Sequence, residues 1–153
     1  KSYAMTGWRL GWLVASPEII RLATRQNGQS VSCAATFTQH ACVAALTGPQ
    51  DNIALMRDAY QQRRDFMVDA LNRIDGVECR SIEGAFYLFP RFPKSQKNSL
   101  ELADALLEQA QIAATPGIAF GQSGEGHLRF AISTAMADLE RAAERLARVA
   151  PSL

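Results

Sequence analysis

The chain has 153 residues, of which 48% are hydrophobic and 20% charged, and its formal net charge is +1. This composition is typical of a globular protein, and the length is enough to bury a single-domain core. There is no basic excess that would favour nucleic acid, and no uninterrupted apolar run approaches the ~18 residues of a membrane span. We also expect no secretory leader, because the charged and polar start lacks the apolar segment of a signal peptide.

The cysteines are odd in number and form no Cys-x-x-Cys pair. They are Cys33, Cys42 and Cys79. This pattern is typical of reduced thiols in a cytoplasmic protein, and it predicts neither a disulfide framework nor a zinc site.

The first third of the chain is predicted to be mainly helical. Leu10–Ala15 is a short apolar run and is expected to form a buried strand. Ser16-Pro17-Glu18 begins a helix, with Ser16 as the N-cap and Pro17 at the first helical position, and Asn27-Gly28 is expected to end it. A second helix is predicted from about Phe37 to Thr47.

The longest helix is predicted to run from Pro49 to about Ile74. At 1.5 Å per residue it is on the order of 40 Å long, too long for a small domain to cover throughout. Its apolar stripe is interrupted at Arg63-Arg64, which indicates that its two halves pack on different bodies. We therefore place a domain boundary within this helix and divide the chain into residues 1–60 and 61–153.

After Gly76 the pattern changes to short β-rich segments interspersed with helices. Asn98 or Ser99 is the predicted N-cap of the next helix, and Glu101 lies at the position that completes a capping box for Asn98. The expected order is β-β-α-β-β-α, a small α+β domain. Its segments are strands at 77–80 and 85–90, a helix from about 99, a strand at 112–114, a turn at 115–117, a mobile loop at 118–126, a strand at 127–133 and a helix at 136–149.

Two residues near the start of the chain carry chemistry. Lys1 has mostly small, apolar or hydroxylated neighbours, and a lysine in apolar surroundings can stay partly neutral and act as an amine nucleophile. Arg9 lies between Gly7 and Gly11, and its guanidinium can hold a phosphate through two parallel hydrogen bonds. Pyridoxal phosphate (PLP) needs both an imine-forming amine and a phosphate clamp. The alternatives are a solvated terminal lysine and a strand-edge arginine paired with a carboxylate.

The segment KSYAMTGWRLG resembles the lysine-attachment signature of the class I/II aminotransferases, which have fold type I of the PLP-dependent enzymes. The constrained positions are met by Lys1, Ala4, Met5, Gly7, Arg9, Leu10 and Gly11. The resemblance covers essentially the whole chain and implies the C-terminal part of such an enzyme. It implies an α/β plus α+β fold, with a portion of the large PLP-binding domain, a long linking helix and the small domain. The family's other cofactor contacts precede the lysine, so we expect the fragment alone to be inactive.

Arg129 lies in an apolar strand, between Leu128 and Phe130, just after a glycine-rich loop. An arginine in that position must face water or meet an anion. The segment from Ala114 to Phe130 is similar to the aminotransferase segment whose arginine binds the substrate α-carboxylate, which implies this role for Arg129. The alternative is an ion pair within its own domain. The loop before Arg129 would then be a lid that orders when substrate binds.

Phe86 lies in a segment, Gly84–Phe89, that resembles the family's strand near the substrate side chain. Phe86 either contacts substrate or packs in the core, and the other aromatic residues of the segment are expected in the core. His40 and His127 have no metal-ligand partners at helical spacing, so we predict a polar structural role for them and no metal site.

The resemblance implies a PLP-dependent aminotransferase that moves an amino group between an amino acid, aspartate-like or other, and a 2-oxo acid. Lys1 would form the internal aldimine with the cofactor, and Arg9 would bind its phosphate. The complete protein is expected to be a cytoplasmic homodimer that binds neither nucleic acid nor membrane. Three alternatives stay open: a PLP-dependent carbon–sulfur or related lyase of the same fold, a non-catalytic aminotransferase-like regulatory domain fused to a DNA-binding module, and a plain α+β interaction domain.

Overall fold

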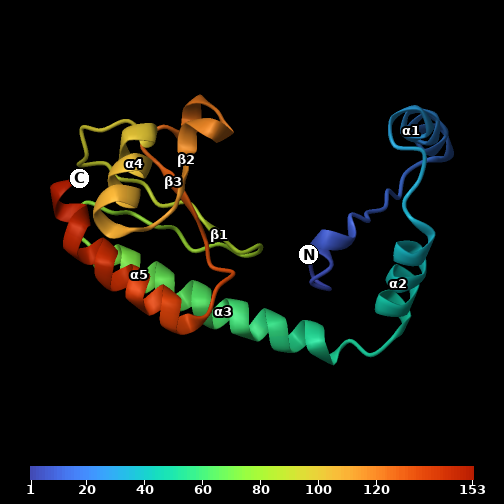
Figure 1. Cartoon of the computed structure of the whole chain (residues 1–153), viewed down its shortest axis with the longest axis horizontal. Coiled ribbons are helices and arrows are strands. Elements are labelled where there is room, and N and C mark those ends of the chain that lie inside the picture. Colours follow the sequence, from blue (N-terminus) through green and yellow to red (C-terminus); the bar gives the residue numbers. More distant parts are fainter. The chain divides into compact units, whose positions relative to one another are not determined.

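The computed structural model describes the whole chain, residues 1–153. The chain forms two compact units, residues 1–57 (unit 1) and residues 58–153 (unit 2). The division falls within the long helix α3 (Asp51–Asn72), and Figure 1 shows this helix running from one unit into the other. The sequence placed its domain boundary in the same helix, after residue 60.

Unit 1 contains two complete helices, α1 (Pro17–Ser30) and α2 (Thr36–Thr47), after a short 3-10 helix η1 (Thr6–Trp8). The second helix has nearly the predicted bounds. It ends where the Gly48 N–H donates to the Ala44 carbonyl oxygen at 2.9 Å.

The strand predicted at Leu10–Ala15 is wrong. These residues form no regular element, and the side chains of Trp12 and Val14 are 65% and 89% exposed. A strand is stabilised by hydrogen bonds to a neighbouring strand, and unit 1 contains no strand. The prediction of burial is wrong as well, and the partner that a strand requires is absent from this unit.

The predicted end of the first helix at Asn27-Gly28 is also wrong, because α1 continues to Ser30. The carbonyl oxygen of Asn27 accepts hydrogen bonds from the backbone N–H groups of Val31 and Ser32, at 2.9 and 3.1 Å. A single glycine costs a helix only about 1 kcal/mol, which the hydrogen bonds of this last turn offset.

Unit 2 is built on a small antiparallel sheet with the strand order β1-β3-β2. The strands are β1 (Tyr87–Leu88), β2 (Thr115–Pro116) and β3 (Leu128–Ala131). In the register, Leu88 lies opposite Phe130, and Thr115 lies opposite Arg129. Since side chains alternate along a strand, one face carries the buried Leu128 and Phe130 and the other carries Arg129.

The core of unit 2 forms between the sheet, the second half of α3, and the helices α4 (Ser99–Ala110) and α5 (Met136–Val149). Helix α5 contributes Leu139 and Leu146, seven residues apart on one face, and its charged residues lie on the remaining surface. No helix of the chain is both long and apolar enough to cross a membrane.

Helix α4 begins with the predicted capping box. The side-chain oxygen of Asn98 accepts the N–H groups of Leu100 and Glu101, both at 3.0 Å, and the Glu101 carboxylate accepts the Asn98 N–H at 2.9 Å. The prediction of this N-terminus from sequence is confirmed.

The expected order β-β-α-β-β-α is wrong in its first strand, since unit 2 has the order β-α-β-β-α after α3. The segment 77–80 contributes a single bridge, between Glu78 and Arg91. The Asn72 side chain binds both the N–H and the carbonyl of Cys79, each at 2.8 Å. These backbone groups are therefore satisfied by an amide side chain instead of a neighbouring strand.

The strand predicted at 112–114 lies instead at Thr115–Pro116, the residues predicted to form a turn. Gln111 ends α4 in the left-handed conformation, with a φ of 55°. Residues 112–114 then connect α4 to β2, which pairs with β3. Pro116 is tolerated because β2 is an edge strand, where proline does not interrupt a ladder.

The glycine-rich loop after β2 is folded into two 3-10 helices, η2 (Gly117–Phe120) and η3 (Gln122–Gly124). The Gly117 N–H donates to the His127 carbonyl at 2.9 Å, and a Cβ on Gly117 would lie within 2.7 Å of the same oxygen. Only glycine allows this closure of the loop. The movement of this loop as a lid when substrate binds stays a prediction.

Candidate functional site

The segment that carries Lys1 and Arg9 is folded by consecutive tight turns. The Ala4 N–H donates to the Lys1 carbonyl at 2.9 Å, and the Trp8 N–H donates to the Met5 carbonyl at 3.1 Å. Ala4 and Arg9 both have a φ of 53°, in the left-handed region that residues other than glycine seldom adopt. Such backbone strain is often found at functional sites, where it sets the direction of a side chain.

These turns bring Lys1 and Arg9 to one hollow of about 380 Å³, which they line together with Met5, Thr6, Leu10 and Gly11. Arg9 is exposed, and its guanidinium donates one long hydrogen bond, 3.4 Å, to the Thr6 carbonyl. It forms no ion pair, so the alternative of an arginine paired with a carboxylate is wrong in this structure. Most of its donors remain available to an anion in the hollow.

The glycines on either side of Arg9 are not explained by packing within unit 1. A Cβ built on Gly7 or on Gly11 would meet no atom within 4 Å. The space beside the backbone is therefore open at both positions, which allows a ligand or another part of a protein to approach closely.

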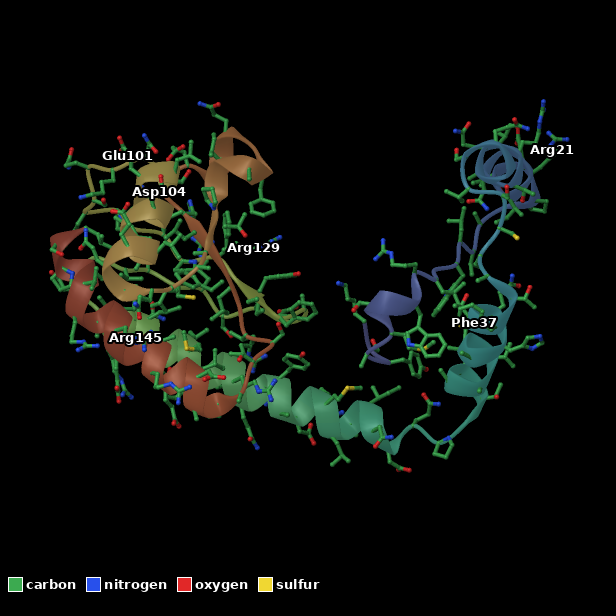
Figure 2. All side chains as sticks on the ribbon, viewed as in Figure 1. Arg21, Phe37, Glu101, Asp104, Arg129 and Arg145 are labelled. Atoms are coloured by element: carbon green, nitrogen blue, oxygen red, sulfur yellow. The ribbon has the colours of Figure 1, made fainter.

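The segment is attached to the rest of unit 1 at both of its aromatic residues. The Tyr3 hydroxyl donates to the Gln50 side chain at 2.9 Å, and the Trp8 ring lies 6.2 Å from the Phe37 ring on α2, where Figure 2 labels Phe37. Gln50 in turn donates to the Ala45 and Gly48 carbonyls, at 3.0 and 2.7 Å. These contacts hold the hollow against the end of α2.

Arg129 lies on β3 in unit 2 and is half-buried; Figure 2 labels it. Its one hydrogen bond is a donation to the Thr115 hydroxyl at 3.3 Å, across the register pair of β2 and β3. It makes no ion pair, so the alternative of a carboxylate partner within its own domain is wrong in this structure. A half-buried guanidinium with most donors free is suited to bind an external carboxylate.

Phe86 is half-buried and packs against the edge of the core. Its ring is stacked on Tyr60 with centroids 5.8 Å apart and lies 4.5 Å from the ring of Tyr87. Its contact with a substrate stays a prediction. Lys1 and Arg9 belong to unit 1, whereas Arg129 and Phe86 belong to unit 2.

Two residues beside Arg129 were missed by the sequence analysis. The Arg129 Cζ atom lies 4.3 Å from the Tyr87 ring centroid and 4.5 Å from that of Phe120. The sequence assigned Tyr87 to the core and gave Phe120 no role. Their sequence positions carry no signal of this contact, because it depends on the strand register and on the fold of the glycine-rich loop.

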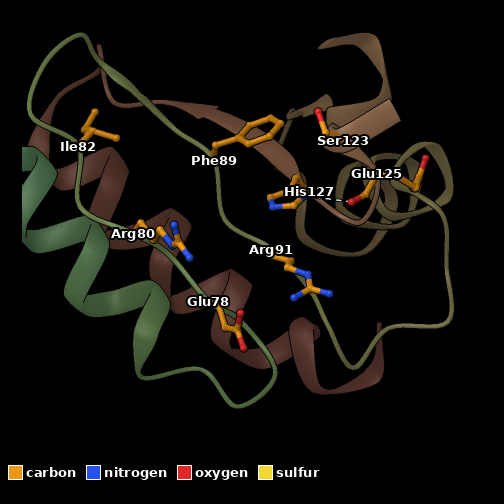
Figure 3. A pocket seen from close by; sticks show the side chains of 8 residues that line it. All are labelled: Glu78, Arg80, Ile82, Phe89, Arg91, Ser123, Glu125 and His127. Carbon is orange, nitrogen blue, oxygen red and sulfur yellow. Dashed lines mark hydrogen bonds between the residues drawn. The ribbon is translucent and has the colours of Figure 1, made fainter. Parts of the chain in front are cut away.

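A second hollow, of about 630 Å³, lies elsewhere on unit 2 (Figure 3). The Glu125 carboxylate beside it accepts the backbone N–H groups of Ser99, at 2.6 Å, and Gly126, at 2.9 Å. These hydrogen bonds, that of Gly126 first, hold the pKa of Glu125 below its ordinary value.

His127 has a polar contact of the kind expected for a structural role. Its Nδ1 atom lies 3.0 Å from the Glu125 carbonyl oxygen. No group of three or more His, Cys, Asp or Glu side chains that could hold a metal is present.

The turn segment with its lysine and arginine, and the sheet with its unpaired arginine, agree with what comparison with known proteins finds. The chain matches the family described as aminotransferase class I and II over residues 1–146, and it belongs to that family.

The chain is 40% identical, over 157 residues, to an aspartate aminotransferase from Rhizobium meliloti, covering 96% of the chain and 38% of that protein. It is 36% identical, over 151 residues, to aromatic-amino-acid aminotransferase 2 from Thermococcus litoralis, covering 97% of the chain and 39% of that protein. The crystal structure of the aspartate aminotransferase from Rhizobium meliloti is similar with a TM-score of 0.89 and 38% identity, over 99% of the chain and 40% of that structure. The chain thus spans about two fifths of the length of these relatives.

The residues of the first hollow fit the cofactor expected for this family. PLP carries an aldehyde and a phosphate, and the hollow presents one amine, from Lys1, and one unpaired guanidinium, from Arg9. The hollow has no acidic lining residue that would repel the phosphate. The donor set therefore matches the two groups by which PLP is held.

Proposed function

We propose that the complete protein is a PLP-dependent aminotransferase that moves an amino group between an amino acid and a 2-oxo acid. The observation that carries this proposal is the shared hollow of Lys1 and Arg9, in a chain that belongs to the class I and II aminotransferase family. Aspartate-like donors come first among the candidates, because aspartate aminotransferases are among the most similar relatives.

Lys1 and Arg9 have separate tasks in this proposal. Arg9 holds the cofactor phosphate through its free N–H donors, and this fixes the cofactor in the hollow. Lys1 would hold the cofactor through its Nζ atom, and its free amine would take and return the proton at the substrate α-carbon. PLP supplies the electron-withdrawing ring that makes that proton acidic.

Arg129 holds the substrate by its α-carboxylate, in the proposed complete protein. The free donors of its guanidinium and the absence of an internal ion pair support this role. Phe86 is proposed to contact the substrate side chain, supported by its half-buried position directly before β1. The proposed assembly is a cytoplasmic homodimer.

The test uses the complete protein, loaded with PLP and supplied with aspartate or an aromatic amino acid, each with a 2-oxo acid. We expect one new amino acid to form for each donor converted, and Lys1→Ala to abolish the transfer. Arg129→Lys is expected to raise the KM for both substrates on the order of 100-fold, because a lysine cannot bind a carboxylate bidentately.

Other outcomes would contradict the proposal. Release of ammonia or a thiol without a second amino acid would identify a lyase. PLP binding without turnover would point to a regulatory domain, and transfer that survives in Lys1→Ala would exclude the assigned lysine.

A further inference from the structure

A row of neighbouring rings on unit 2 includes the Arg129 guanidinium. The neighbours in this row are in ring contact or lie over the guanidinium. They are Tyr60 and Phe86 at 5.8 Å, Phe86 and Tyr87 at 4.5 Å, Tyr87 and Arg129 at 4.3 Å, Arg129 and Phe120 at 4.5 Å, Phe120 and Phe89 at 5.9 Å, and Phe89 and His127 at 4.9 Å. Arg129 lies within the row, and at one end of it the Arg63 Cζ atom lies 5.3 Å from the Tyr60 ring centroid.

The Arg129 guanidinium lies over two rings, those of Tyr87 and Phe120. Each ring lies within 4.5 Å of its Cζ atom, yet the two rings make no contact with each other. The register explains the Tyr87 side, because Tyr87 pairs with Ala131 and so lies diagonally next to Arg129 on the same face. Phe120 reaches Arg129 from η2.

The position of Phe120 is fixed by the closed loop that carries it. Its ring meets the Phe89 ring edge-on at 85°. Gly117, at the start of η2, packs backbone to backbone against Gly124, at the end of η3. Glu125, just after this contact, is bonded to the N-terminus of α4 through the Ser99 N–H. Phe120 is therefore held by the closed loop that carries it and by the contact of its ring with the Phe89 ring.

The N–H donors of Arg129 are the groups that a carboxylate must reach. A guanidinium has five N–H donors, all in its plane, and Arg129 uses one of them for the Thr115 hydroxyl. The faces of a guanidinium carry no donors, so a ring over a face blocks none of them. A carboxylate that binds through two parallel N–H···O bonds approaches in the plane of the guanidinium.

We propose that Tyr87 and Phe120 are positioning residues, whose rings hold the Arg129 guanidinium flat between them so that it receives a substrate carboxylate edge-on. The rings act through the arginine and need not touch the substrate. This inference rests on the proposed function in taking the bound carboxylate to be that of the substrate. The clamp itself rests on the geometry of unit 2.

The geometry is tested first on the 153-residue chain, without cofactor or substrate. Rings above and below a guanidinium shift its proton resonances, so the Arg129 Nε–H signal is expected to lie apart from those of the other arginines in a ¹⁵N–¹H spectrum. Phe120→Leu, which keeps the bulk and removes the ring, is expected to move the signal toward the others. Tyr87→Phe keeps the ring and should leave it in place. An Arg129 signal that is unaffected by Phe120→Leu overturns the clamp.

The function of the clamp is tested by steady-state kinetics on the complete, PLP-loaded protein. Phe120→Leu is expected to raise the KM for the amino acid and for the 2-oxo acid about tenfold, with kcat within about twofold of the unchanged protein. Tyr87→Leu should raise both KM values in the same way, and Phe89→Leu, which removes a ring that meets the Phe120 ring edge-on, should have a smaller effect. If Phe120 had only a structural role, Phe120→Leu would lower the unfolding temperature or kcat, and it would not raise KM at nearly constant kcat.

The outcomes separate the clamp from the proposed function. If Arg129→Lys raises both KM values and Phe120→Leu does not, the clamp is wrong and the role of Arg129 stands. If Arg129→Lys changes neither KM, the carboxylate role of Arg129 is wrong, whatever the spectrum shows. If the complete protein transfers no amino group, the proposed function fails, and the spectrum of the chain still decides whether the clamp exists.

Discussion

The two units of this chain differ in how they use their apolar residues. All the buried hydrophobic side chains lie in unit 2, whereas the one buried residue of unit 1 is Thr38. Unit 1 instead exposes large apolar side chains, such as Trp12, Val14 and Phe37. Exposed apolar surface of this extent is typical of a surface that packs against further protein. Unit 2 is thus stabilised by its own hydrophobic core. The candidate cofactor residues, Lys1 and Arg9, lie in unit 1, which has no such core.

The largest expected effect comes from a matched pair of leucine-to-alanine substitutions, one in each unit. Leu106 on α4 is fully buried, and Leu106→Ala is expected to lower the free energy of unfolding by about 3 kcal/mol. Leu55, on the first turns of α3 in unit 1, is 67% exposed, so Leu55→Ala should change it by less than about 0.5 kcal/mol.

The measurement for this pair is urea unfolding followed by circular dichroism. Leu107→Ala serves as the control on α4 itself, because Leu107 is 54% exposed. Tryptophan fluorescence gives a second signal that reports unit 1 alone, since Trp8 and Trp12 are the only tryptophans of the chain. Equal losses in Leu106→Ala and Leu55→Ala would contradict the contrast between the units.

A smaller effect is expected where Asn72 binds the backbone of Cys79. Asn72→Ala leaves one N–H and one carbonyl without partners, and should cost about 2 kcal/mol of unfolding free energy. Burial raises the pKa of the Cys79 thiol to about 11, so at pH 8 a thiol reagent should modify the exposed Cys33 long before Cys79.

The rate of Cys79 modification checks this prediction. It should rise in Asn72→Ala, while Asn52→Ala, an exposed site on the same helix, should leave it unchanged. Modification of Cys79 at the rate of Cys33 in the unchanged protein would show that the segment 77–80 is not held as described.

The smallest effect is expected at Glu125, whose lowered pKa arises from the Gly126 and Ser99 N–H groups. A carboxylate with a lowered pKa stabilises the folded state above its unfolded value of 4.5, and this contribution is lost as the pH falls through the folded pKa. Glu125→Gln should therefore flatten the loss of unfolding free energy below pH 4.5. Glu83→Gln, at an exposed site without a hydrogen bond, should leave the pH dependence unchanged; a flattening there would contradict the assignment.

Local signals in the sequence predicted local structure well. The capping box of Asn98 and Glu101 and the stop of α2 before Gly48 each depend on a few adjacent residues, and both are found where the sequence placed them. The Lys1 and Arg9 pair was also visible, because the turns that bring the two residues together are contained in one short segment.

Predictions failed where a distant partner decides the outcome. Leu10–Ala15 forms no strand because unit 1 contains no other strand to pair with. The segment 77–80 forms no strand because the Asn72 side chain makes the hydrogen bonds to the Cys79 backbone that a neighbouring strand would make. The rings around Arg129 come from β1 and η2, far apart in sequence, and only the register brings them together.

The most direct test of the proposed function is the identity of the lysine that holds PLP. The complete protein, loaded with PLP, is reduced with borohydride, digested and examined by mass spectrometry. We predict that the pyridoxyl group is found on Lys1, and that the other lysines of the chain, Lys94 and Lys97, are unmodified. A pyridoxyl group on a different lysine, or on none, would contradict the account.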